Sequence, residues 1–182
     1  MATSGLNSVL KFWFAELKPA DWFKKSDALD SIITTRFKSL HREQAQESEL
    51  ALGAQSWKVL AQVIVLDQFS RNMFRGQAEA FAYDDLALKL AQSAVARGLD
   101  RSLSDDQRAF LYMPYMHSED ITIHEHACRL FAKLSKQSYL QFEYKHKAII
   151  DRFGRYPHRN DVLGRPSTSE EVAFLATPGS SF

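Results

Sequence analysis

Arginine side chains recur in two separate stretches of this sequence, and both stretches could recognise an anion. The first is the polar end of a long apolar run, where Asp67 and Arg71 lie one helical turn apart. The second is residues 154–165, which also contain glycine and proline. Guanidinium groups hold carboxylate or phosphate through paired, charge-assisted hydrogen bonds. We therefore expect a small-anion site whose ligand-binding residues are Asp67, Arg71, Glu119, Arg155, Arg159, Asn160 and Arg165.

Two histidines would add proton-transfer chemistry to this site. His117 is expected at the end of a helix and His158 in the second stretch, and imidazoles titrate near neutral pH. A carboxylate could orient either ring as a general acid or base, so both are candidate catalytic residues for hydrolysis of the bound anion. An anion beside His158 would favour its protonated form, so binding should weaken as the pH rises through neutrality. The chain contains no Gly-x-Ser-x-Gly nucleophile motif, and whether it is an enzyme stays open.

The same charges also allow a structural interpretation. Because buried charges are usually paired, the arginines could instead bridge helix ends through Asp67, Glu119, Asp120 and Asp161. The chain would then be a helical-repeat scaffold that binds a protein partner in the groove between helix pairs. Geometry separates the two interpretations: side chains that line an open cleft favour a ligand, and a sealed, fully paired cluster favours the scaffold.

No metal and no cofactor are expected. His124 and Cys128 lie one helical turn apart, but the sequence has neither an H-E-x-x-H motif nor paired C-x-x-C motifs. His124 and His126 are expected at the surface or at its boundary. His146 falls on an apolar stripe, so we expect a buried, neutral ring with a hydrogen-bond partner.

Helices must position these residues, because every apolar pattern in the chain has helical spacing and none has the alternation of a strand. Residues 57–76 form the expected central helix, which is apolar nearly all round from Val59 to Leu66 and therefore buried. The other expected helices cover residues 6–17, 26–40, 81–98, 104–117, 118–134 and 139–153, with a short one after Ser167. Residues 42–49 are expected to be a solvated tail. Short connections predict antiparallel helix hairpins.

Several residues are expected to begin, bend or end these helices. Ser104 with Gln107 and Ser167 with Glu170 fit the capping-box pattern. Ser118 is expected to cap the following helix. Pro114 predicts a kink because its ring removes a backbone hydrogen bond. The glycines at 76, 98 and 154 are expected to end the helices before them.

Composition predicts one all-α domain over residues 1–182 and restricts its partners. The 23 Lys and Arg residues nearly balance the 22 Asp and Glu residues, so no strong field indicates nucleic acid or a membrane surface. The single cysteine, Cys128, fits a reducing compartment. We find neither a secretion signal nor a run of about 20 apolar residues. These features predict a cytoplasmic protein whose partner is a small anion or, under the scaffold interpretation, a protein.

Long motifs give the sequence a family resemblance. The stretches LDQFSRNMFRG (66–76), MHSED (116–120), FGRYPHRN (153–160) and LGRPSTSEEVAFL (163–175) together resemble the uncharacterised bacterial family named domain of unknown function 924. FWF at 12–14 and the final GSSF fit as well, so the likeness covers essentially the whole chain. The resemblance implies a tetratricopeptide-like all-α fold and no established reaction. This chain has Ser70, Tyr156 and Ala148 where the family pattern usually has Pro, Phe and Asp.

Overall fold

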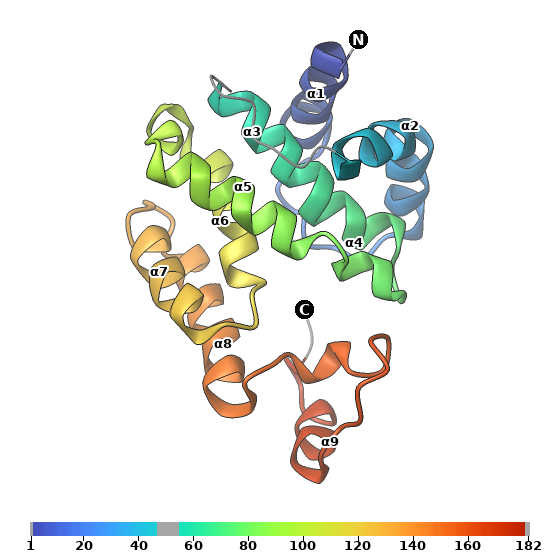
Figure 1. The fold of residues 1–182 in the computed structure, drawn as a ribbon, viewed down its shortest axis with the longest axis vertical. Helices are drawn as coiled ribbons and strands as arrows, with labels where there is room; N and C mark the ends of the chain where they lie inside the picture. The colour runs from blue at the N-terminus through green and yellow to red at the C-terminus, as the bar shows by residue number, and fades with distance from the viewer. Residues whose placement is uncertain (1, 47–54, 181–182) are drawn as a thin grey trace.

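The computed structural model describes residues 2–46 and 55–180, and every regular element in these two ranges is a helix (Figure 1). The all-α prediction is therefore confirmed. The α-helices are α1 (Ala2–Lys11), α2 (Asp27–Gln46), α3 (Ser56–Val63), α4 (Ser70–Met73), α5 (Asp84–Ala96), α6 (Asp105–Met116), α7 (Ile121–Phe131), α8 (Gln137–Phe153) and α9 (Ser169–Leu175). Short 3-10 helices cover Ala78–Phe81, Leu99–Ser102 and Pro157–Arg159, and wider π-helical turns cover Phe12–Glu16 and Ile64–Phe69.

The helices pack in sequence order around the predicted central segment. Helix α3 contacts α1 and α5, and each of α5, α6 and α7 contacts the helix that follows it. Rings of Trp13, Phe69 and Phe110 meet edge to face within the main core, with centroids 5.5–5.6 Å apart. A smaller cluster of Ile149, Ile150, Tyr156, Phe153 and Phe174 attaches the chain after α8. A tetratricopeptide-like arrangement stays a prediction.

The central segment is helical from Ser56 to Met73, but its middle turn is a π-helix (Ile64–Phe69). Two of its backbone carbonyl oxygens accept hydrogen bonds from side chains one turn further along the chain. Ser70 Oγ donates to the carbonyl oxygen of Leu66 at 2.6 Å, and Arg71 Nη1 donates to that of Asp67 at 2.9 Å. Such side-chain bonds compete with the regular α-helical ladder. The wide turn lies where the buried apolar run becomes polar, and π turns are frequent at functional sites.

Two predicted helix caps are confirmed and two are displaced by one or two residues. Ser104 and Gln107 form both bonds of a capping box, and Gly154 ends α8 with φ 67°. Helix α7 is capped by Asp120, whose carboxylate accepts from the N–H of Thr122; Ser118 accepts from the N–H of Asp120 instead. Thr168 and Glu171 replace the predicted pair in the last capping box, because Glu171 lies where its carboxylate reaches the N–H of Thr168. Helix α6 continues through Pro114 to Met116.

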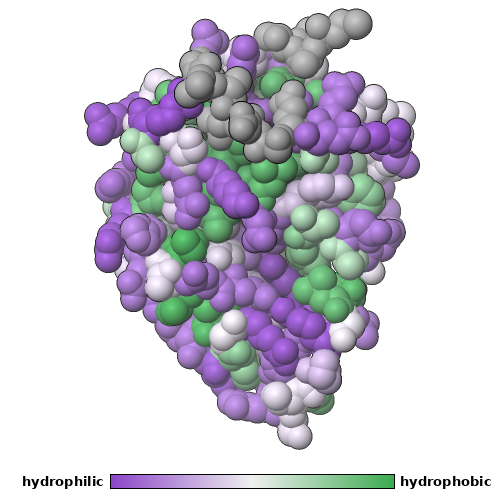
Figure 2. All heavy atoms as spheres, in the orientation of Figure 1, coloured by the Kyte–Doolittle hydropathy of each residue, from purple (hydrophilic) through white to green (hydrophobic). Residues whose placement is uncertain are grey.

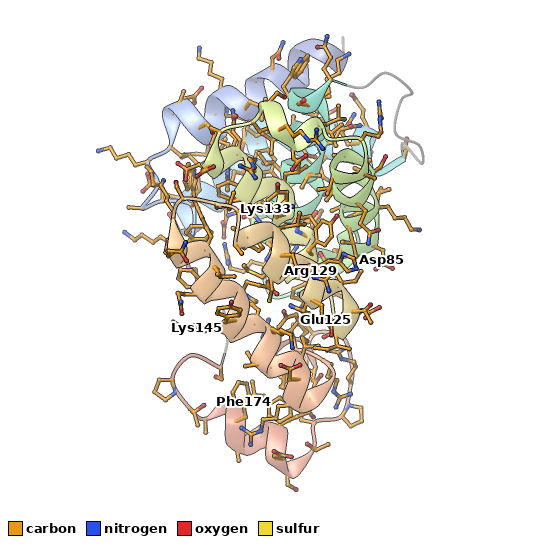
Figure 3. The ribbon with its side chains drawn as sticks, turned by 90° about the vertical axis from the view of Figure 1, so that its left-hand side faces the viewer. Asp85, Glu125, Arg129, Lys133, Lys145 and Phe174 are labelled. Carbon is orange, nitrogen blue, oxygen red and sulfur yellow. The ribbon has the colours of Figure 1, made fainter. Side chains whose placement is uncertain are left out.

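Burial also corrects several expectations. Gln44 is buried rather than solvated, because its side-chain oxygen accepts from Gln62 of α3 at 2.9 Å. Ile32, Ile121 and Phe142 have helical spacing toward the core, yet they are 46%, 37% and 47% exposed. Figure 3 labels a charged outer row formed by Glu125 and Arg129 of α7 and by Lys133 just after this helix. Residues 47–49 of the predicted tail lie outside the described residues.

Candidate functional site

Arg71 joins the central segment to the start of α5. Its Nη1 and Nη2 donate to the two carboxylate oxygens of Asp84 at 2.8 and 2.9 Å. Nη1 also lies 3.1 Å from Asp67 Oδ1, so one guanidinium contacts two carboxylates. Its side chain is 20% exposed, whereas that of Asp67 is not exposed at all. Asp84 is not among the predicted site residues, and its role as the bridge to Arg71 was not predicted.

His117 at the end of α6 pairs with Asp67. Its Nδ1 lies 2.6 Å from Asp67 Oδ1, and Gln68 donates to the other carboxylate oxygen at 2.6 Å. Burial acts to raise the pKa of Asp67, but the charge of Arg71 and the hydrogen bonds from His117 and Gln68 outweigh it and hold that pKa well below its usual range. Burial and then Arg71 lower the pKa of His117, so the ring is neutral at pH 7. Nδ1 therefore carries the proton that Asp67 accepts, and Nε2 is an acceptor.

Arg159 lies flat between two aromatic rings. Its guanidinium carbon is 4.6 Å from the ring centroids of both Phe81 and Tyr156. Nη1 donates to Asp84 Oδ2 at 3.2 Å, and Nη2 donates to the carbonyl oxygen of His117 at 2.9 Å. Its Nε is buried and has no hydrogen-bond partner among the described residues. The guanidinium is thus held in place by a minority of its donors.

The other two histidines near this cluster are neutral. Burial, and then the charges of Arg159 and Arg71, lower the pKa of His158 to about 4. The expected loss of anion binding through neutrality by deprotonation of His158 is therefore wrong, because this ring is already neutral at pH 6. His146 is buried as predicted, with its Nδ1 2.8 Å from the carbonyl oxygen of Phe142. Burial lowers its pKa to about 3.

A cavity of about 390 Å³ opens beside these residues, and we call it the cationic cavity. Among residues 2–46 and 55–180, the five charged side chains in its wall are all cations: Lys24, Lys25, Arg71, Arg75 and Arg159. The histidines at 117, 146 and 158 also line it. The rest of the wall is mainly apolar and includes Trp22, Phe23, Phe81, Met113, Met116 and Phe142.

A second cavity of about 500 Å³, the acidic cavity, lies across a shared wall of Phe81, His117 and Arg159. Its lining has the opposite sign, with the carboxylates of Glu79, Asp84, Asp85 and Glu119 and a single cation, Arg159. Figure 2 shows hydrophilic residues running through the lower middle of one face of the molecule, with hydrophobic groups on either side.

The remaining predicted ligand residues, apart from Asp67, form a clamp outside the cationic cavity, and Glu119 is the one clamp residue that lines the acidic cavity. Arg155 donates twice to the buried carboxylate of Glu171, at 2.7 and 2.8 Å. Asn160 donates to the same carboxylate at 3.3 Å. Arg165 holds Glu119 through two bonds of 2.7 and 3.0 Å. We call these five residues the C-terminal clamp. The structure therefore separates Arg71, Arg159, His117 and His158, which line the cationic cavity, from the rest of the predicted set.

A buried pair between α7 and α8 was also not predicted. His124, expected at the surface or boundary, is fully buried, with Nδ1 2.8 Å from Glu143 Oε1 and Nε2 2.8 Å from the carbonyl oxygen of Ser118. Burial raises the pKa of Glu143. Ala148, where the family pattern has Asp, is exposed and lines neither cavity.

Two structural findings concern other classes of site. Within residues 2–46 and 55–180, no three His, Cys, Asp or Glu side chains are arranged to hold a metal ion. In the same part of the chain, no helix combines the length and apolar character needed to cross a membrane.

Comparisons with known proteins agree with the sequence motifs. The structure is similar to that of a protein of unknown function from Agrobacterium tumefaciens, with a TM-score of 0.87 and 36% sequence identity over 97% of this chain and 99% of that chain. A comparison with curated proteins gave no match. A family model described as a bacterial protein of unknown function, DUF924, matches residues 9–179. The chain therefore belongs to the DUF924 family.

Proposed function

We propose that the protein binds a small organic anion in the cationic cavity. The observation that carries this proposal is the sign of the lining, because all charged side chains in the wall are cations. The carboxylates that pair with its arginines, Asp67, Asp84 and Asp30, are absent from that wall. A volume of about 390 Å³ also falls in the range of small-molecule sites, roughly 300–1,000 Å³.

The two inner arginines have donors to spare for such a ligand. Arg71 uses three of its five N–H groups in hydrogen bonds within the protein, and Arg159 uses two. Both guanidinium groups are fixed by Asp84, so little side-chain entropy is lost when an anion binds them. Lys24 and Lys25 add exposed positive charge to the cavity wall, and the charge of Lys25 also reaches Asp30, whose pKa it helps to lower. That charge attracts an anion from solution.

The Asp67–His117 pair supports hydrolysis as a second candidate function. A neutral imidazole whose Nδ1–H is held by a carboxylate can accept a proton at Nε2, and His117 lies in the cavity wall. Water attacking the carbonyl carbon of an ester would give a proton to this atom, and the imidazole would return that proton to the alcohol oxygen as the acyl–oxygen bond breaks, which leaves an acid and an alcohol. A panel of p-nitrophenyl esters tests this function: turnover that His117→Gln lowers by about a hundredfold supports it, and turnover unchanged in that variant contradicts it.

Binding is tested by calorimetry at low salt with benzoate and with benzyl alcohol, its neutral analogue. We expect heat from benzoate and a loss of affinity of about tenfold or more in Arg159→Gln, since a charge-assisted hydrogen bond is removed. Lys24→Gln with Lys25→Gln should weaken binding several-fold. Lys133→Gln is the control for the loss of one exposed charge outside the cavity, just after α7, and should leave binding unchanged.

Histidine NMR signals locate the ligand in the same experiment. Signals of His117 and His158 should shift on addition of benzoate, whereas exposed His126 should not respond. Equal affinity for benzoate and benzyl alcohol, or no heat with either, contradicts the proposal. In that case the charge cluster is structural, as the scaffold interpretation holds.

A further inference from the structure

Two exposed aromatic rings stand at the entrance of the cationic cavity. Phe23 is 61% exposed and Phe142 is 47% exposed, although both are large apolar side chains in the cavity wall. Their ring centroids lie 6.5 Å apart with planes inclined by 25°. The ring centroid of Trp22 lies 6.5 Å from that of Phe23. The three rings form an aromatic group drawn from two distant parts of the chain. The ring of Phe23 stacks on the buried ring of Phe110, with centroids 6.0 Å apart and planes inclined by 9°, but a large part of the Phe23 and Phe142 side chains stays uncovered.

The opposite end of the cavity is polar. Both inner arginines, Arg71 and Arg159, lie over the ring of Phe81. Their guanidinium carbons are 5.6 Å and 4.6 Å, respectively, from its centroid. These arginines are far less exposed than the aromatic rings, at 20% for Arg71 and 7% for Arg159. Met113 and Met116 of α6 also line the cavity, and methionine side chains adapt to apolar ligands of varied shape. The cavity therefore has a buried end with two arginines and a mouth where the exposed aromatic rings lie in the same wall as Lys24 and Lys25.

The charge balance at the polar end selects the type of anion. Arg71 and Arg159 carry two positive charges, and their partners Asp67 and Asp84 carry two negative charges. The three histidines do not add charge, because their rings are neutral. The polar end thus offers N–H donors with little spare charge. A monoanion suits this environment better than a dianion, whose second charge would be desolvated without compensation.

We propose that the ligand is an amphipathic monocarboxylate. Its carboxylate lies against Arg71 and Arg159, and its apolar tail runs outward along Met113 to Phe23 and Phe142. This inference rests on the proposed anion-binding function and adds the class and the orientation of the ligand. A tail in this position would cover the two exposed rings, which removes apolar surface from water.

The test is calorimetry with acetate, hexanoate, octanoate and 1-octanol. Each methylene transferred from water to an apolar wall strengthens binding about fourfold, so octanoate, with two more methylenes, should bind about fifteenfold more tightly than hexanoate. Octanol has the same tail without the charge and should bind at least tenfold more weakly than octanoate. If acetate, hexanoate and octanoate bind with equal affinity, the proposed contact of the apolar tail is contradicted, whereas the proposed binding of an anion is not. If octanol binds as tightly as octanoate, or if none of the four binds, the anion site fails as well.

Two substitutions at the mouth locate the tail. Phe23→Ser with Phe142→Ser removes the exposed rings, and octanoate should then bind on the order of tenfold more weakly. Acetate affinity should not change. Tyr144→Ser is the matched control, because Tyr144 is 49% exposed on the same helix and does not line the cavity. Octanoate affinity that is unchanged in the double variant overturns the proposed path of the tail.

Discussion

The cationic and acidic cavities share a wall, yet their charged linings have opposite signs. Asp84 explains this difference, because its carboxylate lines the acidic cavity while its partner Arg71 lines the cationic one. Arg159 also pairs with Asp84 and lies in the wall between them. The wall is therefore a layer of ion pairs that present cations to one side and carboxylates to the other. A count of charges in the sequence, which nearly balance, does not reveal such a separation.

Removing Arg71 should have the largest effect, because it breaks this wall. Arg71→Ala leaves Asp67 fully buried without its cation, and loss of one partner of a buried pair costs about 3–5 kcal/mol. Arg42→Ala is the control: Arg42 is exposed on α2, and its loss should change stability by less than about 0.5 kcal/mol. Urea unfolding measures both. Equal midpoints for the two variants would show that Arg71 does not hold the wall together.

Acid should destabilise the protein through the histidines of the cationic cavity. The folded pKa values of His146 and His158, about 3 and about 4, lie below the unfolded value near 6.5. The unfolded state therefore takes up protons first, so this stability is complete above about pH 6.5 and is lost as the pH falls toward the folded pKa values. From pH 6.5 to 5 the loss should be on the order of 2 kcal/mol.

Urea unfolding at about pH 7 and pH 5 measures this loss. His158→Gln should reduce it, since one of the two shifted rings is gone, and His126→Gln should not alter the difference. Burial raises the pKa of Glu143, so protonation of this carboxyl stabilises the folded state as the pH falls and offsets part of the loss. The test is therefore the difference between the variants and the wild type. A loss of the same size in His158→Gln and the wild type would contradict a neutral, buried His158.

The sequence predicted the all-α fold because helical spacing of apolar residues is local information. It also singled out Asp67, Arg71, His117 and Arg159 as candidate site residues, since charged and polar residue types at helix ends and in a loop are visible without a structure. It did not reveal Asp84, because a carboxylate in the first turn of α5 has a sufficient local explanation. Nor did it separate Arg159 from Arg155, four residues away. Which cavity a loop arginine reaches depends on the 3-10 turn Pro157–Arg159 and on long-range contacts that spacing does not encode.

The aromatic mouth was missed for a related reason. Phe142 fell on the apolar stripe of its helix, so the pattern placed it in the core together with Tyr139 and Ile149. Periodicity assigns a face of a helix but not what covers that face. In the structure, Phe23 is the ring that lies beside Phe142, with centroids 6.5 Å apart, and Phe142 remains 47% exposed. Such a long-range contact is not encoded in the spacing of residues along the helix.

Breaking the C-terminal clamp should reduce stability less than removing Arg71. It compares an arginine that only holds the fold together with the arginines that line the cationic cavity. Arg165→Ala removes the partner of Glu119, but the two side chains are 24% and 27% exposed. We expect a loss of roughly 1 kcal/mol, because water screens the pair. Benzoate affinity should be the same as in the wild type at a temperature where both are folded. Weaker binding in Arg165→Ala would place the clamp at the ligand.

The smallest effect should come from the acidic cavity. Glu79→Gln with Asp85→Asn removes two exposed charges from its lining. Stability should change by less than about 0.5 kcal/mol. Benzoate affinity should change by less than about twofold at a salt concentration near 0.15 M, since screening acts within roughly 8 Å. A change as large as that in the double lysine variant would mean that the two cavities act as one electrostatic site.

The position of a bound carboxylate tests the account most directly. Crystals grown with 8-bromooctanoate report both ends of the ligand, because bromine is located by its anomalous scattering. The account predicts a carboxylate within hydrogen-bond distance of Arg71 or Arg159, about 2.7–3.2 Å, and a bromine beside Phe23 and Phe142. A carboxylate turned toward Lys24 and Lys25 with bromine at the inner arginines would contradict the proposed orientation, and a ligand in the acidic cavity would contradict the anion site itself.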